Sequence, residues 1–288
     1  MQTYTTLIST NALADLLASS NGNVAVVDCR FALDDTAQGR QHYLAGHIPG
    51  AVYAHLDEDL SGPIITGETG RHPLPSVEAF VETLSSWGID SHTQVVAYDS
   101  AGGLYAGRLW WMLRWLGHDA VALLDGDWRQ WVKEERPTVA GEETRTASTF
   151  VAQVREEMVA SVDDVIANLE TNAYQLFDAR DEGRFRGEPS PRDPVSGHIP
   201  GAKSAFFAHN LTSDGHWQSA DALKARFDTL LDGQSTDETI FYCGSGVSAA
   251  HNLLALEHIG YTGAKLYVGS WSDWINDRSR PVEKSVGV

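Results

Sequence analysis

The chain has 288 residues, of which 42% are hydrophobic and nine are tryptophan, enough to bury the core of one large or two ordinary globular domains. Its 39 acidic and 21 basic residues give a formal net charge of −18, which repels phosphate backbones and anionic lipids, so neither nucleic acid nor membrane partners are expected. The first residues lack the patterns of signal and transit peptides and no apolar run could span a bilayer, so the sequence predicts a cytoplasmic protein.

Short apolar runs alternate with helical patterns along the first half of the chain. The strand patterns are VAVVD at 24–28, TQVVAYD at 93–99 and AVALLDG at 120–126, and the helical patterns are SVEAFVETLSSWG at 76–88 and YAGRLWWMLRWLG at 105–117. Strands that alternate with helices favour a parallel sheet covered on both faces. The polar stretch at 135–149 follows and is the expected linker.

The second half repeats the first in the same order. VAVVDCR at 24–30 matches YQLFDAR at 174–180, AGHIPGA at 45–51 recurs as SGHIPGA at 196–202, and LGHDAVALLDGDWRQW at 116–131 matches IGYTGAKLYVGSWSDW at 259–274. Repeats of this length indicate a duplicated domain and not a solenoid. The sequence therefore predicts an α/β fold of two tandem domains, residues 1–140 and 150–288.

The chain has two cysteines, Cys29 and Cys243, too few for a disulfide framework or a four-cysteine zinc site. Cys29 aligns with an alanine of the second half and is interpreted as a small buried residue. Cys243 follows the strand pattern TIFY directly, and a helical pattern resumes near Ser248, so the residues between them must form a tight loop. In open α/β sheets, ligands bind at such strand ends.

The loop after Cys243 is suited to holding an anion. Gly244 and Gly246 allow backbone angles forbidden to other residues, so successive N–H groups can turn toward the loop centre, at the positive end of the following helix. A free cysteine has a pKa of about 8.5, and this setting lowers it, which makes a thiolate nucleophile available. Asp99 stands at the matching position of the first half, so only the second half carries the nucleophile.

Protein tyrosine phosphatases also place a loop of this kind after a cysteine, with an arginine six positions later that holds phosphate. That position is Ala249 here, and the loop contains no basic residue, so a phosphatase is disfavoured.

The repeated GHIPGA element, the aspartate in the first-half loop and the sequence CGSGVS resemble the tandem-domain sulfurtransferases of the rhodanese superfamily over nearly the whole chain. Members that use thiosulfate tend to carry basic residues after the cysteine, whereas those that use 3-mercaptopyruvate carry a CGSGVT-like loop. The resemblance implies two rhodanese-like domains, the second catalytic. It also implies that Cys243 takes sulfur from 3-mercaptopyruvate as a persulfide, releases pyruvate and passes the sulfur to a thiol or cyanide.

The same resemblance implies the other site residues. Arg184 and Arg192 would bind the α-keto acid, while Arg186 is interpreted as part of a surface ion pair. Ser245, His72 and Asp57 would form a proton relay, and because the last two come from the first domain, the site is expected at a domain interface. The residues expected to line the substrate in the cysteine loop are Gly244, Gly246, Val247 and Ser248.

Two alternatives stay open at this point. Thiosulfate could replace 3-mercaptopyruvate as the sulfur donor, or the chain could be a non-catalytic carrier whose Cys243 holds a persulfide delivered by a partner. No residues have metal-ligand spacing and no dinucleotide or phosphate-binding motif is found, so neither metal nor cofactor is expected. The acceptor, a small thiol or a protein such as thioredoxin, cannot be identified from one chain.

Overall fold

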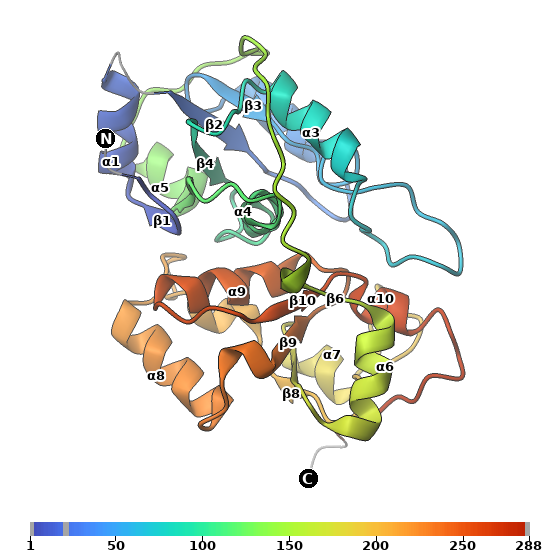
Figure 1. Ribbon diagram of the computed structural model, residues 1–288. Helices are drawn as coiled ribbons and strands as arrows, with labels where there is room; N and C mark the ends of the chain where they lie inside the picture. The colour runs from blue at the N-terminus through green and yellow to red at the C-terminus, as the bar shows by residue number, and fades with distance from the viewer. Residues whose placement is uncertain (1–2, 20–22, 286–288) are drawn as a thin grey trace. The chain divides into compact units, whose positions relative to one another are not determined.

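The computed structural model describes residues 3–19 and 23–285, which form two compact units. Unit 1 comprises Met1–Gly62, Pro75–Arg155 and Leu211–Trp217, and unit 2 comprises Pro63–Leu74, Glu156–Asn210 and Gln218–Val288. Each unit contains its own sheet and helices (Figure 1). The short segments 63–74 and 211–217 therefore belong to a different unit from their neighbours in sequence.

The sheet of unit 1 has five parallel strands in the order β1-β5-β4-β2-β3. Its strands are β1 (Leu7–Ile8), β2 (Val24–Asp28), β3 (Ala51–Tyr53), β4 (Gln94–Tyr98) and β5 (Val121–Leu124). Every residue of β2 and β4 is buried, as expected for central strands covered on both faces.

Helices cover both faces of this sheet. They are α1 (Thr10–Ala18), α2 (Gln38–Ala45), α3 (Val77–Ser86), α4 (Ala106–Trp115) and α5 (Asp127–Lys133). Leu13 of α1, Tyr43 of α2 and Trp131 of α5 share one apolar core with the strands. The chain steps from β3 to β4 to β5 in one direction across the sheet, so right-handed crossovers place the connecting helices α3 and α4 together on the other face.

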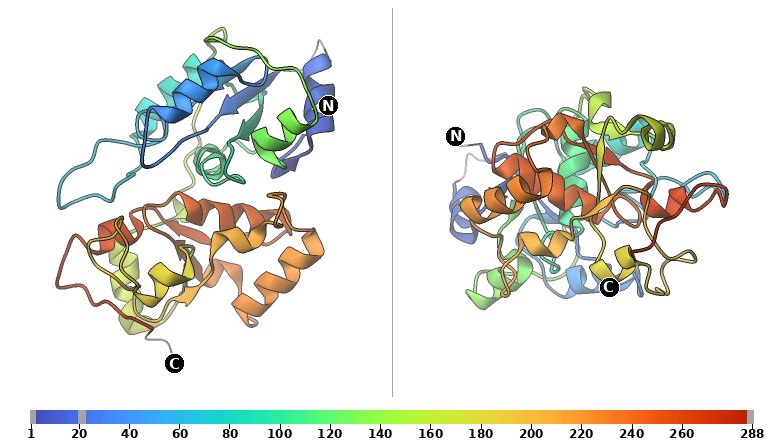
Figure 2. Two further views of the ribbon diagram at one scale, coloured as in Figure 1. Left: turned by 180° about the vertical axis from the view of Figure 1, so that it is seen from behind. Right: turned by 90° about the horizontal axis from the view of Figure 1, so that it is seen from below.

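Unit 2 repeats this architecture, with strand order β6-β10-β9-β7-β8 and all pairs parallel. Its strands are β6 (Val159–Ala160), β7 (Gln175–Asp178), β8 (Lys203–Ser204), β9 (Thr239–Tyr242) and β10 (Lys265–Tyr267). Its helices are α6 (Val162–Thr171), α7 (Glu182–Arg186), α8 (Ala220–Leu231), α9 (Ser248–His258) and α10 (Ser270–Trp274), with short 3-10 turns η1 (Glu156–Met158), η2 (Phe207–Asn210) and η3 (Thr236–Glu238). Helices α6 and α8 lie on opposite sides of the sheet (Figures 1 and 2).

Local sequence signals explain where several helices begin. Ser76 and Ser219 accept a hydrogen bond from the N–H three residues later at the starts of α3 and α8. Ser161 and Asp164 form a reciprocal capping box at the start of α6. The expected α/β fold of two tandem units, each with a parallel sheet, is thus confirmed, and within the described residues no helix is long and apolar enough to cross a membrane.

Candidate active site

Cys243 is the first residue after β9 and is only 2% exposed. Its N–H donates to Ser270 Oγ at 3.1 Å, and its carbonyl accepts from the N–H of Trp271 at 2.9 Å. Both partners are the first residues of α10. The backbone of the cysteine is therefore fixed on two sides at the carboxyl end of the sheet.

Three donors converge on the Cys243 thiol. Burial raises its pKa, but the Ser248 hydroxyl and the backbone N–H groups of Ser245 and Ala249 outweigh this, so that the pKa is lowered overall. Gly246 has φ of 75°, a left-handed conformation that lets the loop turn tightly into α9. The loop can therefore hold a thiolate, and equally a persulfide anion.

Two guanidinium groups lie directly over Gly244. A β-carbon at this position would come within 2.8 Å of Arg184 Nη2 and 3.0 Å of Arg71 Nη2, so a side chain here would displace the cations. Sequence reasoning identified Arg184 but missed Arg71, whose only signal was its place beside His72. Two cations next to the Cys243 thiol suit an anionic ligand, although the loop itself has no basic residue.

Ser245 and His72 form a buried pair. The Ser245 hydroxyl lies 2.7 Å from His72 Nδ1, and both residues are 7% exposed. This distance suits proton transfer between the two side chains.

The segment 63–74 places His72 at this position. Asn276 Nδ2 donates to the carbonyl of Thr69 at 2.8 Å, and the N–H of Arg71 donates to Ser272 Oγ at 3.0 Å. A β-carbon on Gly70 would come within 2.5 Å of the Gly269 carbonyl oxygen, so only glycine allows this close approach. His72 thus belongs to unit 2, which corrects the expectation that it would come with the first domain.

Asp57, the expected third member of the relay, belongs to unit 1. Its N–H donates to His55 Nδ1 at 3.2 Å, and burial raises the pKa of its carboxyl group. Its role in orienting His72 stays a prediction.

The other expected arginines have different surroundings. Arg192 is exposed, its backbone carbonyl accepts from Arg71 Nη1 at 2.9 Å, and it lines a hollow of about 280 Å³ together with Arg184. Its role as a substrate ligand stays a prediction. Arg186 lies 3.3 Å from Glu182 and 2.9 Å from Glu188, at the surface.

The matching loop of unit 1 is occupied by its own side chain. The carboxylate of Asp99 accepts hydrogen bonds from four backbone N–H groups at 2.8–3.0 Å, those of Ala101, Gly103, Tyr105 and Ala106. Burial and the nearby Asp127 raise the pKa of Asp99 despite these donors. A loop at this place in the fold therefore directs its N–H groups toward one acceptor. In unit 1 that acceptor is the covalently attached carboxylate of Asp99.

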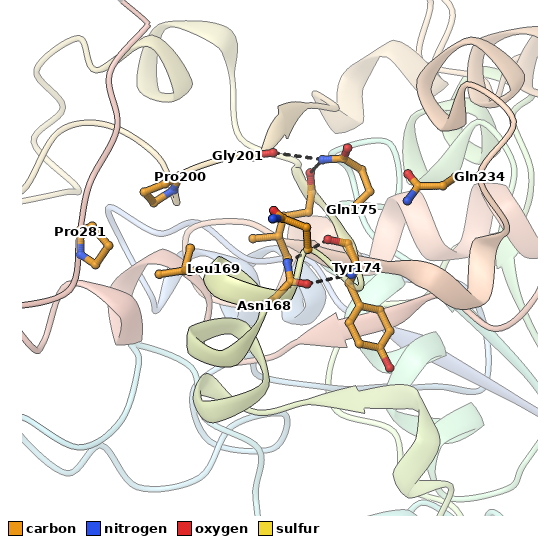
Figure 3. Close-up of a pocket in the computed structure, with 10 residues that line it drawn as sticks. Asn168, Leu169, Tyr174, Gln175, Pro200, Gly201, Gln234 and Pro281 are labelled. Carbon is orange, nitrogen blue, oxygen red and sulfur yellow. Dashed lines mark hydrogen bonds between the residues drawn. The ribbon is translucent and has the colours of Figure 1, made fainter.

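A second cavity of unit 2, of about 320 Å³, lies at the amino end of β7 and thus away from Cys243 (Figure 3). The side-chain amides of Asn168 and Gln175 are already bonded to the backbone. Asn168 exchanges two hydrogen bonds with the backbone of Tyr174, and Gln175 Nε2 donates to the Gly201 carbonyl. It contains no nucleophile. Within residues 3–19 and 23–285, no cluster of three or more His, Cys, Asp or Glu side chains could hold a metal ion.

Known proteins resemble this chain over nearly its whole length. The rhodanese-like domain matches residues 9–134 and 161–277. A probable 3-mercaptopyruvate sulfurtransferase of Pseudomonas aeruginosa is 45% identical over 264 residues, covering 91% of this chain and 93% of that protein. The thiosulfate sulfurtransferase of Cricetulus griseus is 34% identical over 295 residues, covering 99% and 96%. A 3-mercaptopyruvate sulfotransferase of Escherichia coli, known from its crystal structure, has a TM-score of 0.79 and 32% identity, covering 93% of this chain and all of that one. The chain therefore belongs to the rhodanese family and carries two rhodanese-like domains.

Proposed function

We propose that this protein transfers sulfur from 3-mercaptopyruvate to a thiol or cyanide acceptor through a persulfide on Cys243. The observation that carries the proposal is the pair of cations, Arg71 and Arg184, over Gly244, beside a thiol whose pKa is lowered by the loop. Its relatives include 3-mercaptopyruvate and thiosulfate sulfurtransferases.

In the first half-reaction the Cys243 thiolate attacks the sulfur of the donor. An S–S bond forms, the C–S bond of the donor breaks, and its electron pair passes to the carbon of the departing pyruvate enolate. The proton of the donor thiol ends on that carbon, so the products are the persulfide anion and pyruvate. The donors around Cys243 that stabilise the thiolate also suit the persulfide.

The two arginines bind the carboxylate and the neighbouring carbonyl of the donor. A guanidinium group matches the geometry of both acceptors.

Ser245 and His72 move the proton. His72 Nδ1 lies within hydrogen-bond distance of the Ser245 hydroxyl, so the pair can take a proton from the donor thiol and return it to the enolate. A carrier that only holds a persulfide would not need this pair.

In the second half-reaction an acceptor thiol attacks the outer sulfur of the persulfide. The S–S bond breaks, the outer sulfur leaves with the acceptor, and the Cys243 thiolate is restored. A small thiol or a thioredoxin-like protein would serve as acceptor. A cytoplasmic location stays a prediction of the sequence.

Thiosulfate is a second candidate donor, because a dianion could bind the same two cations and a thiosulfate sulfurtransferase is among the relatives. Intact mass spectrometry after incubation with each donor separates the candidates. We expect a gain of about 32 Da with 3-mercaptopyruvate, reversed by a thiol, absent in Cys243→Ser and retained in Cys29→Ser. Faster loading from thiosulfate would make thiosulfate the preferred donor. No gain in mass with either donor would leave only the carrier interpretation.

A further inference from the structure

Asp193 is a buried carboxylate surrounded by three arginines from separate parts of unit 2. Its side chain is 3% exposed. Oδ2 lies 2.7 Å from both Nε and Nη2 of Arg184 and 3.4 Å from Arg180 Nη1, and Oδ1 lies 3.4 Å from Arg71 Nη1. One carboxylate thus bridges the two cations that lie over Gly244.

The ion pair of Arg180 is part of the duplicated framework. Arg180 binds Asp178 and the Gly197 carbonyl, each at 2.6 Å. In unit 1, Arg30 binds Asp28 at 2.5 Å and the carbonyl of the equivalent glycine at 2.7 Å. This framework is also present in unit 1, which has no counterpart of Cys243, so it does not require Asp193.

Asp193 lies in an insertion that only the second half carries. Tyr43 stacks on His47 and Phe185 stacks on His198, and in both pairs the histidine Nδ1 contacts the carbonyl of its aromatic partner. The pairs are therefore equivalent, but the first spans four residues and the second thirteen, from 185 to 198. The nine additional residues supply Asp193, and they occur in the unit that has the nucleophile.

The contact between Asp193 and Arg184 fixes the plane of the guanidinium group. Arg184 Nε donates to Oδ2. Nη2 lies 2.7 Å from the same oxygen but out of line for a hydrogen bond, and it is buried over Gly244. A buried donor of this kind gains a full hydrogen bond when an anionic ligand arrives. Burial lowers the pKa of the Arg71 guanidinium; Asp193 opposes this and Arg184 adds to it. The Asp193 carboxylate thus offsets the repulsion between the two cations, and without it they would move apart.

We propose that Asp193 is a positioning residue that holds Arg184 and Arg71 in place for the carboxylate of the α-keto acid donor. The inference rests on the proposed function. The two guanidinium groups bind the donor carboxylate before and during C–S cleavage alike, so Asp193 acts on donor binding and not on the sulfur chemistry.

The test compares Asp193→Asn with Glu182→Gln, a matched control on α7 that forms an ion pair with Arg186 at the surface. With 3-mercaptopyruvate, we expect Asp193→Asn to raise KM about 10- to 100-fold at nearly constant kcat, because binding common to ground and transition state is lost. Transfer to a thiol from a Cys243 persulfide loaded with inorganic polysulfide should change less than about twofold. Glu182→Gln should leave all three values unchanged.

A mutant cycle separates positioning from a general structural role. In an Arg71→Ala/Arg184→Ala background, Asp193→Asn should cause little further loss of kcat/KM, because both residues that it positions are already absent. Additive losses, equal losses in both half-reactions, or an unchanged KM in the single variant would overturn the proposal.

A binding measurement makes the inference independent of turnover. Pyruvate should bind Cys243→Ser about tenfold or more tightly than Cys243→Ser/Asp193→Asn in calorimetry, and equal affinities would overturn the role of Asp193. If the wild type took no sulfur from 3-mercaptopyruvate but this difference held, the proposed function would fail while the positioning role stood.

Discussion

The two cysteines are almost equally buried, but the pKa of one thiol is raised and that of the other is lowered. Burial raises the pKa of Cys29, and the carboxylates of Asp28 and Asp99 raise it further. Cys243 is also buried, but the hydroxyl and N–H donors of its loop lower its pKa. The local donors, and not exposure, therefore decide which thiol is reactive.

The first prediction concerns this difference. In a Cys29→Ser protein, the rate of Cys243 alkylation by iodoacetamide should rise with pH to a plateau. The midpoint of this rise, which reports the pKa of the thiol, should lie below the ordinary value of about 8.5. A lowered pKa means that thiolate is already present on the acidic side of that value. Mass spectrometry at each pH gives the midpoint, and one at or above 8.5 would contradict the assigned role of the loop.

The second prediction concerns the proton relay. His72→Ala and Ser245→Ala should each lower kcat for 3-mercaptopyruvate by about 10²- to 10⁴-fold, because the donor thiol and the enolate lose their proton carrier. The double variant should be little worse than either single one, since the two residues act as a unit. His92→Ala, at an exposed histidine of unit 1, is the control. Near-normal kcat in either relay variant would favour the carrier interpretation.

At the scale of elements, the segment 63–74 supplies two side chains of the candidate site. It has no helix or strand, and it places Arg71 and His72 beside the cysteine loop through contacts with 269–276. The close approach at Gly70 fixes its path.

The third prediction tests this path. Gly70→Ala should lower the free energy of unfolding by about 1–3 kcal/mol, because its methyl group meets a backbone carbonyl that cannot move easily. It should also reduce kcat/KM, since both neighbouring site residues shift. Gly46→Ala is the control, because its methyl group would meet only ordinary contacts at 3.9 Å or more. Thermal unfolding and steady-state kinetics give the two quantities, and equal behaviour of the variants would refute the argument.

The predictability of the elements follows from their length and burial. The central strands could be predicted from short apolar runs, and the helices α3, α4 and α9 from five or more apolar residues that recur at helical spacing. The edge strands β1, β6 and β8 have two residues each, too few for any period. The transfer of segment 63–74 to unit 2 depends on contacts with residues two hundred positions away, which no local pattern contains.

The same reasoning applies to the site residues. Cys243, Ser245 and the two glycines could be predicted because the strand, loop and helix that define their setting are contiguous in sequence. Arg71 and Asp193 could not, because only the folded chain brings them to Gly244 and to each other. His72 and Arg184 were found through resemblance to a family and not from the spacing of residues.

At the scale of the whole molecule, duplication has preserved the framework and changed the loops. The buried histidines His47 and His198 each contact a backbone carbonyl through Nδ1, at 2.8 and 2.7 Å. The aspartate–arginine pairs after β2 and β7 also match. Two loops differ: the loop after β4 or β9 carries an aspartate in one unit and a cysteine in the other, and only unit 2 has the nine additional residues that include Asp193.

The fourth prediction concerns the aspartate. Asp99→Ala should destabilise the protein by about 2 kcal/mol or more, because four buried N–H groups lose their acceptor. The folded fraction should still load one sulfur per chain, since Cys243 is untouched. Denaturant unfolding and intact mass measure the two effects; unchanged stability would show that the Asp99 carboxylate does not hold the loop.

The occupied loop of unit 1 also provides a template for inhibitors. Each oxygen of the Asp99 carboxylate already takes two N–H groups, which gives the geometry in which such a loop satisfies a planar anion. A small molecule that presented a carboxylate to the Cys243 loop, and a second anionic group to the two arginines above it, would combine both recognition elements in one scaffold. Because unit 1 blocks its own loop, such a compound would have a single target per chain.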